Sequence, residues 1–135
     1  MTRPKWGANS LNTRETIDPR LNAVSDVVLQ IRDHSIIQGH RGEHEQNAAF
    51  DAGNSKLRWP DGKHNKLPSL ALDMQPYPLP QDHDTLREDL SYLAGLYVGV
   101  GRMMGLTLRW GGDFDMDGET ADNHWDDLYH IEIVE

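Results

Sequence analysis

Three side chains of this sequence, His64, Asp73 and His130, are of the types that hold catalytic zinc. Two imidazoles and one carboxylate leave a fourth position on the metal for a water molecule. Asp127 precedes His130 by three residues and is placed to act as the base that such a water needs. The combination is typical of a zinc hydrolase, although on spacing alone chance clustering in a chain rich in aspartate and histidine is the better explanation.

The composition limits the kinds of protein and of site that the chain can form. Its 135 residues suffice for one domain with a core of its own. Because the chain contains no cysteine, disulfides and thiolate zinc sites are excluded, and a metal would be held by His, Asp or Glu. The formal net charge of −9 argues against a nucleic-acid-binding protein, which normally carries a basic face. No apolar segment typical of a signal peptide or a membrane span is visible, which predicts a protein kept in the cytosol unless something else exports it.

The spacing of apolar residues predicts an α+β fold, in which a small antiparallel sheet packs with two or three helices. Residues 1–20 are polar and are expected to form a loosely held leader before a single domain over residues 21–135. The predicted helices cover residues 21–31, which follow a helix start at Asp18-Pro19, 43–52 and 85–104. The predicted strands cover residues 34–39, 70–74, 106–110 and 129–133.

Four ordered stretches between about residues 17 and 132 carry a further signal. They are Gly39-His40-Arg41 with Gln46, the segment from Ser55 through His64 to Ala71-Leu72-Asp73, the run Arg109-Trp110-Gly111-Gly112-Asp113-Phe114, and the closing Asp127-Leu128-Tyr129-His130-Ile131-Glu132. In this order they resemble motifs of the superfamily of VanY-like D-alanyl-D-alanine carboxypeptidases and phage L-alanyl-D-glutamate endopeptidases. The resemblance implies the fold of that superfamily, which also occurs in the hedgehog signalling domain.

The resemblance also implies a role for the residues that match the metal motifs. His64, Asp73 and His130 would bind one Zn²⁺ per chain, and Asp127 would take a proton from the attacking water. The other histidines are expected to have no metal role; they are His34, His40, His44, His83 and His124.

By the same resemblance, Arg41 would bind substrate and stabilise the oxyanion, and Gln46 would assist it in binding substrate. Lys63 or Lys66 would help Arg41 to attract a substrate that carries carboxylates. The alternative for Arg41 is a surface salt bridge with Glu43 or Glu45. Two tryptophans of the matching stretches, Trp59 and Trp110, are expected in the core or in the wall of a cleft.

Three departures from the superfamily pattern bear on substrate choice more than on metal binding. Gly62 stands where the family usually has serine, and Ser69 stands where it usually has glycine. The nine-residue separation of His64 and Asp73 is longer than in the commonest form, and Leu67-Pro68 is the apparent insertion. A loop that bulges away from the metal can absorb such an insertion.

An acidic stretch suggests a second metal site. Asp113, Asp115 and Asp117, followed by Gly118, copy the first half of an EF-hand loop and could bind Ca²⁺ weakly. The second half fails, because position twelve is His124 instead of glutamate. A solvated acidic loop is therefore the alternative.

The resemblance implies a zinc peptidase that hydrolyses the peptide stems of bacterial peptidoglycan, of the L-alanyl-D-glutamate endopeptidase type, acting as a phage endolysin. A monomeric enzyme would collect in the host cytosol and reach the wall when a holin opens the membrane. One alternative is a D-Ala-D-Ala carboxypeptidase with the same metal chemistry. Another is a catalytically inactive wall- or virion-binding module on the same fold, against which the intact ligands and base argue.

Overall fold

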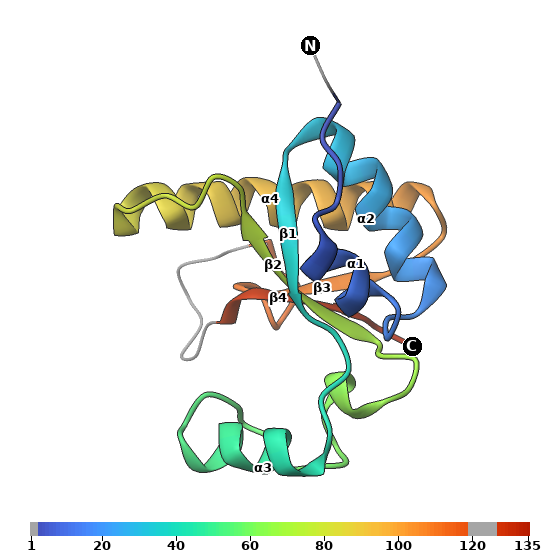
Figure 1. The fold of residues 1–135 in the computed structure, drawn as a ribbon, viewed down its shortest axis with the longest axis vertical. Coiled ribbons are helices and arrows are strands. Elements are labelled where there is room, and N and C mark those ends of the chain that lie inside the picture. The colour runs from blue at the N-terminus through green and yellow to red at the C-terminus, as the bar shows by residue number, and fades with distance from the viewer. Residues whose placement is uncertain (1–2, 119–126) are drawn as a thin grey trace.

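The computed structural model describes residues 3–118 and 127–135, which form helices around a small sheet (Figure 1). Every helix and strand predicted above is present, with ends shifted by one or two residues. The elements are α1 (Ala8–Arg14), α2 (Pro19–Ile31), β1 (His34–Gln38), α3 (Glu43–Asp51), the 3-10 helix η1 (Lys63–Asn65), β2 (Ala71–Pro76), α4 (His83–Met103), β3 (Leu108–Gly111) and β4 (Asp127–Ile133).

The four described strands form one antiparallel sheet in the order β1-β2-β4-β3, which confirms the predicted α+β class. In the register of β2 and β4, Asp73 lies opposite His130. In the register of β3 and β4, Arg109 lies opposite Glu132. Since side chains alternate between the two faces of a strand, His130 and Glu132 share a face of β4.

Local signals explain where the two long helices begin. The Asp18 side chain accepts a hydrogen bond from the backbone N–H of Arg20 at 2.9 Å, and Pro19 follows in the first turn of α2. Asp82 caps α4 in the same way, through the N–H of Thr85 at 2.9 Å. Helix α4 crosses the sheet and packs against β2, β3, β4 and α2.

The hydrophobic core lies between these helices and the sheet. Helices α2 and α4 and the four strands contribute apolar side chains. Removing these side chains from water stabilises the fold by roughly 25 cal/mol per Å² of buried apolar surface. The buried core residues are Ile17, Leu21, Val24, Val28, Ile36, Leu72, Met74, Leu90, Leu93, Ala94, Tyr97, Leu108, Trp110, Ile131 and Ile133.

The amino-terminal segment differs from the loosely held leader expected from the sequence. Residues 8–14 form helix α1, which packs against β1. Ser10 is buried and its Oγ accepts a hydrogen bond from the backbone N–H of Ile36. Ile17 belongs to the core, and the Trp6 ring packs edge-on against His34. The sequence does not predict this helix, because α1 has no apolar stripe and buries a serine.

Residues 42–61, called the α3 segment below, lie apart from the sheet and from helices α1, α2 and α4 (Figure 1). The segment contributes no side chain to the hydrophobic core. Within residues 42–61, all of which the structure describes, Gln46 is the one buried residue. Helix α3 ends as predicted before Gly53, whose φ of 79° is one that glycine adopts easily.

None of the helices in the described ranges has the length and apolar character that crossing a membrane requires.

Candidate metal centre and active site

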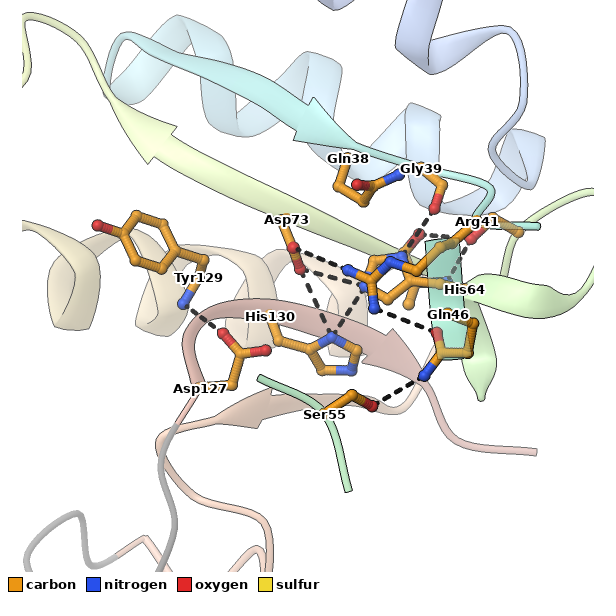
Figure 2. A network of polar contacts seen from close by, with 12 residues as sticks. Gln38, Gly39, Arg41, Gln46, Ser55, His64, Asp73, Asp127, Tyr129 and His130 are labelled. Atoms are coloured by element: carbon orange, nitrogen blue, oxygen red, sulfur yellow. Dashed lines mark hydrogen bonds and ion pairs between the residues drawn. The ribbon is translucent and has the colours of Figure 1, made fainter. Parts of the chain in front are cut away.

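The side chains of His64, Asp73 and His130 converge on one point (Figure 2). The His64 Nε2 atom lies 3.2 Å from Asp73 Oδ1 and 3.2 Å from His130 Nδ1. The His130 Nδ1 atom lies 3.6 Å from Asp73 Oδ1. The sequence therefore predicted correctly that these three residues come together, and each presents one donor atom to a common centre.

Three separate elements supply this cluster. His64 comes from η1, and its Nδ1 lies 2.7 Å from the backbone oxygen of Gly39, which turns Nε2 towards the cluster. Asp73 and His130 come from paired positions of β2 and β4, so the sheet register holds them face to face. Strand positions hold such residues more rigidly than loop positions do.

A second layer of contacts orients His130. Its Nε2 lies 2.7 Å from Glu132 Oε1, and Glu132 Oε2 accepts a hydrogen bond from Arg109 Nη2 at 2.8 Å. Both His130 and Glu132 are buried. A carboxylate on the outer nitrogen of a histidine fixes its tautomer and ring orientation.

The electrostatics of the cluster favour positive charge at its centre. Burial alone raises the pKa of the Asp73 carboxyl, but its hydrogen bonds with His130 and His64 outweigh burial and hold the pKa well below its usual range. Burial alone lowers the pKa of His130, but its bonds to Asp73 and Glu132 raise it to about 9. For Glu132, burial is outweighed by His130 and Arg109, which lower its pKa to about 2. Two ionised carboxylates thus flank the ring of His130.

Asp127 lies at the start of β4, beside the cluster (Figure 2). Burial and the nearby Asp73 carboxylate raise the pKa of Asp127 above its ordinary value. A carboxylate with a raised pKa is a better proton acceptor near neutral pH. Asp127 therefore combines a place in the cavity wall with a raised pKa.

Gly111 explains how β3 and β4 meet at Asp127. The two residues are paired at the end of the β3–β4 ladder, next to a register shift. A Cβ atom at position 111 would lie 1.9 Å from the backbone oxygen of Asp127. Only glycine permits this approach, so Gly111 determines where the backbone of Asp127 lies.

Arg41 faces the cluster and not the surface carboxylates Glu43 and Glu45. Its Nη1 donates a hydrogen bond to Gln46 Oε1 at 3.1 Å, and its Nη2 lies 3.9 Å from Asp73 Oδ2. Its side chain is only 16% exposed. The surface salt bridge considered as the alternative for Arg41 is therefore not what the structure contains.

The cluster opens into a cavity of about 470 Å³. Its wall includes Arg41, Arg109, Phe114 and Asp127, together with residues of the α3 segment. Lys63 also lines the cavity, but its Nζ donates a hydrogen bond to the backbone oxygen of Ile133 at 2.9 Å. Lys66 is exposed and is not among the lining residues. Of the two lysines considered from the sequence, Lys63 is therefore the one that lies at the cavity.

The departures from the superfamily pattern are accommodated within the protein. Ser69 is fully buried and its hydroxyl donates to the backbone oxygen of Ala71 at 2.7 Å. Leu67 is 72% exposed, so the inserted residues bulge outwards and leave the cluster intact. A Cβ at Gly62 would lie 2.8 Å from Asn65 Oδ1, which accepts a hydrogen bond from the Gly62 N–H.

The acidic loop brings one oxygen each of Asp113, Asp115 and Asp117 within 4.8 Å of one another. Asp115 and Asp117 are exposed, and exposed acidic groups commonly cluster without an ion. The calcium site remains a prediction that nothing here supports. His124, at position twelve of that loop, lies outside the described residues.

Sequence reasoning missed some contributors to the site. The sequence motifs assign no role to Glu132 and Arg109, yet their opposed positions on β4 and β3 complete the support of His130. The signal that could have found Glu132 is its two-residue spacing from His130 on a strand. Of the two tryptophans, Trp110 is in the core, whereas Trp59 is 40% exposed and lies in neither the core nor the cavity wall.

Comparisons with known proteins find the same fold elsewhere. The chain is similar to the L-Ala D-Glu endopeptidase ChiX of Serratia marcescens, with 19% identity and a TM-score of 0.72, over 96% of this chain and 90% of that chain. It is also similar to the vancomycin resistance D,D-dipeptidase VanXYg, solved with a D-Ala-D-Ala phosphinate analog, with 18% identity and a TM-score of 0.52, over 86% of this chain and 48% of that chain. Both similarities confirm the fold. A search of curated protein sequences finds no match.

A family model described as phage L-alanyl-D-glutamate peptidase matches residues 3–134. The match includes all four sequence stretches that carry the resemblance, and it spans every residue of the cluster and the cavity wall. The chain therefore belongs to the phage L-alanyl-D-glutamate peptidase family.

Proposed function

We propose that this peptidase uses Zn²⁺ to hydrolyse the L-alanyl-D-glutamate bond in the peptide stems of bacterial peptidoglycan. The observation that carries the proposal is the convergence of His64, Asp73 and His130 at a cavity whose wall includes Asp127. Family membership supports the bond, and the donor set supports the metal.

The three donors fit zinc. Two imidazole nitrogens and one carboxylate oxygen are the ligands that zinc takes in catalytic sites, with one position left for water. Gly39 holds the outer nitrogen of His64, and Glu132 holds that of His130, so each ring has one nitrogen directed at the centre. When bound, zinc polarises a carbonyl and lowers the pKa of a bound water molecule towards about 7.

The protein's own residues would then carry the proton and the charge. Asp127 would accept the proton of the attacking water and return it to the departing amine, since both acts need one carboxylate within reach of the scissile bond. Arg41 would bind the substrate and stabilise the oxyanion, because its planar fork offers fixed donors to developing negative charge. Glu132 and Arg109 hold His130 and have no part in proton transfer.

The family supports a role in the phage life cycle. In this proposal the chain acts as one monomeric peptidase domain without inserting into the membrane. It collects in the host cytosol and is released to the wall when a holin opens the membrane. Muropeptide analysis of cells that express the chain with and without a holin would test the route of release.

Mass spectrometry of purified muropeptides incubated with zinc-loaded protein tests the bond. The expected products are a muramyl-L-alanine fragment and a peptide that begins with D-glutamate. Loss of a single D-alanine would instead indicate a carboxypeptidase. Intact muropeptides in the presence of protein that holds one zinc per chain would indicate an inactive binding module. His64→Ala is the control for metal dependence, because it removes one donor and should neither hold zinc nor cleave.

A further inference from the structure

The α3 segment forms part of the cavity wall without being anchored in the hydrophobic core. Asn54, Ser55, Lys56 and Leu57 line the cavity, yet no side chain of residues 42–61 joins the core. Apolar packing therefore cannot set the position of this wall. Another interaction must hold it against the body.

The side-chain amide of Gln46 supplies that interaction. Its Nε2 donates to Ser55 Oγ at 2.8 Å and to the backbone oxygen of Leu57 at 2.6 Å. Its Oε1 accepts from Arg41 Nη1 and from Asn65 Nδ2, both at 3.1 Å. Gln46 is only 2% exposed. Two donors and two acceptor sites are all that an amide side chain offers, so Gln46 has no capacity left for a substrate.

We infer that Gln46 is a positioning residue that connects the two sides of the cavity, and not a substrate contact. One end of its amide fixes the guanidinium of Arg41, and the other end fixes the wall at Ser55–Leu57 (Figure 2). Because both are bonded to this amide, the position of the wall and the position of the Arg41 side chain depend on each other. The inference deepens the proposed function, because it relies on Arg41 acting on the substrate.

A neighbouring side chain, Asn65, connects Gln46 and Arg41 to the cluster of His64, Asp73 and His130. Asn65, in η1, donates from Nδ2 both to Gln46 Oε1 and to the backbone oxygen of Arg41 at 3.0 Å. The backbone N–H of Arg41 donates to the backbone oxygen of His64 at 2.7 Å. Gln46 therefore sets the wall relative to the donor cluster as well as to Arg41.

Limited proteolysis tests the wall without using activity. Lys56 and Arg58 are trypsin sites within it. Gln46→Ala should raise the rate of trypsin cleavage after these residues at least tenfold. The matched control is Asn47→Ala, which leaves the Gln46 contacts but removes the hydrogen bond from Trp59 N–H to Asn47 Oδ1. Because that N–H belongs to the bond cut after Arg58, the two variants are compared at Lys56, where the control should raise cleavage much less. Equal rates after Lys56 in the two variants would overturn the inference.

The accessibility of the Arg41 guanidinium can be measured by chemical modification of the same proteins. Phenylglyoxal modification, read by peptide mass mapping, should label Arg41 several-fold faster in Gln46→Ala than in Asn47→Ala or the parent. Gln46→Glu keeps the size of the side chain and an acceptor for Arg41, but it places an oxygen against the Leu57 carbonyl. It should loosen the wall while Arg41 stays protected, and it serves as the test if Gln46→Ala does not fold. Arg41 labelling that is unchanged in Gln46→Ala, or raised in Gln46→Glu, would overturn the inference.

A double-mutant cycle then links Gln46 to catalysis. Gln46→Ala should lower kcat/KM about tenfold, the loss expected when a hydrogen bond to a charged group is removed. In an Arg41→Lys background it should cost no more than about twofold, because contacting residues are not additive. Fully additive losses would overturn the inference. Absence of muropeptide cleavage by the parent protein would instead reject the proposed function, and the trypsin and labelling results would still decide the role of Gln46.

Discussion

His130 and Glu132 stand two residues apart on the same face of β4, with His130 Nε2 and Glu132 Oε1 separated by 2.7 Å. Arg109, opposite Glu132 on β3, holds the second carboxylate oxygen at 2.8 Å. Because Nε2 is occupied, Nδ1 is the nitrogen that His130 directs at His64 and Asp73. Glu132 thus decides which nitrogen of the ring is available to a metal.

Glu132→Gln should weaken zinc binding about 10- to 100-fold, the usual effect of removing a partner of a metal-bound histidine. The amide has no negative charge for His130, and its NH₂ group would face the guanidinium of Arg109. Competition with a zinc chelator measures the affinity. Glu135→Gln is the control, because Glu135 is 53% exposed and pairs with Arg20. Equal zinc affinities in the two variants would contradict this role.

Asp127→Ala should retain zinc and the fold but lose about 10²- to 10⁴-fold in kcat, because no group accepts the proton of the attacking water. Zinc content and the rate of muropeptide cleavage, measured on the same preparation, separate the base from the ligands. Asp115→Ala, another carboxylate that lines the cavity, should stay within a few-fold of the parent. If Asp127→Ala cleaves nearly as fast as the parent, Asp126, outside the described residues, becomes the residue to test.

Gly111→Ala should reduce kcat at least about tenfold while zinc stays bound. The added methyl would lie 1.9 Å from the backbone oxygen of Asp127, so the start of β4 must move and carry Asp127 with it. Gly95→Ala on α4, where a Cβ meets nothing within 4 Å, should leave kcat unchanged. Full activity of Gly111→Ala would mean that the position of Asp127 tolerates this displacement.

Arg41→Lys should lower kcat/KM at least about tenfold, or about 1.4 kcal/mol of transition-state stabilisation. Lysine keeps the charge but loses the planar fork that reaches both Gln46 and the vicinity of Asp73. Lys66→Ala, on the exposed surface, should change kcat/KM far less. Unchanged kinetics of Arg41→Lys would show that Arg41 does not act on the substrate.

His34 should make the protein less stable in acid. Burial lowers the pKa of His34 to about 4, whereas the unfolded chain has an ordinary value of about 6.5. The unfolded state therefore binds the proton more readily, and stability that is complete above pH 6.5 is lost as the pH falls towards 4. The loss approaches about 3 kcal/mol, at about 1.4 kcal/mol per pH unit.

Urea unfolding of the parent and of His34→Gln at pH 7 and pH 4.5 measures this contribution. The difference in unfolding free energy between the two proteins should shift in favour of the variant at the lower pH, because glutamine does not titrate. His44→Gln, at an exposed position of α3, should show no such shift. A constant difference between the parent and His34→Gln at both pH values would contradict the prediction.

Much of the fold could be predicted because its elements carry local signals. Helix α2 follows from Asp18-Pro19 and a regular apolar face, and β4 follows from an alternating run. Helix α1 could not be predicted in this way: it buries Ser10, whereas Leu11 is 50% exposed. Its position depends on contacts with β1 that exist only in three dimensions.

The site also has a part that the sequence predicts and a part that only the three-dimensional structure reveals. Residue type and motif sufficed for His64, Asp73 and His130, whose convergence the structure confirms. The contact from Arg109 to Glu132 depends on strand register, which one strand's sequence does not contain. Gln46 was expected to touch substrate, because a motif match cannot reveal that all of its hydrogen-bonding capacity is already used within the protein.

The separation of the α3 segment from the hydrophobic core has a consequence for engineering. Residues 42–61 shape the cavity but contribute no core side chain, so exchanging them leaves the main source of folding stability untouched. Apart from Gln46 and its partner Ser55, the segment can be replaced by libraries of sequence, while β2, β4 and η1 continue to present Asp73, His130 and His64. Substrate range and thermal tolerance can therefore be optimised in separate rounds of selection.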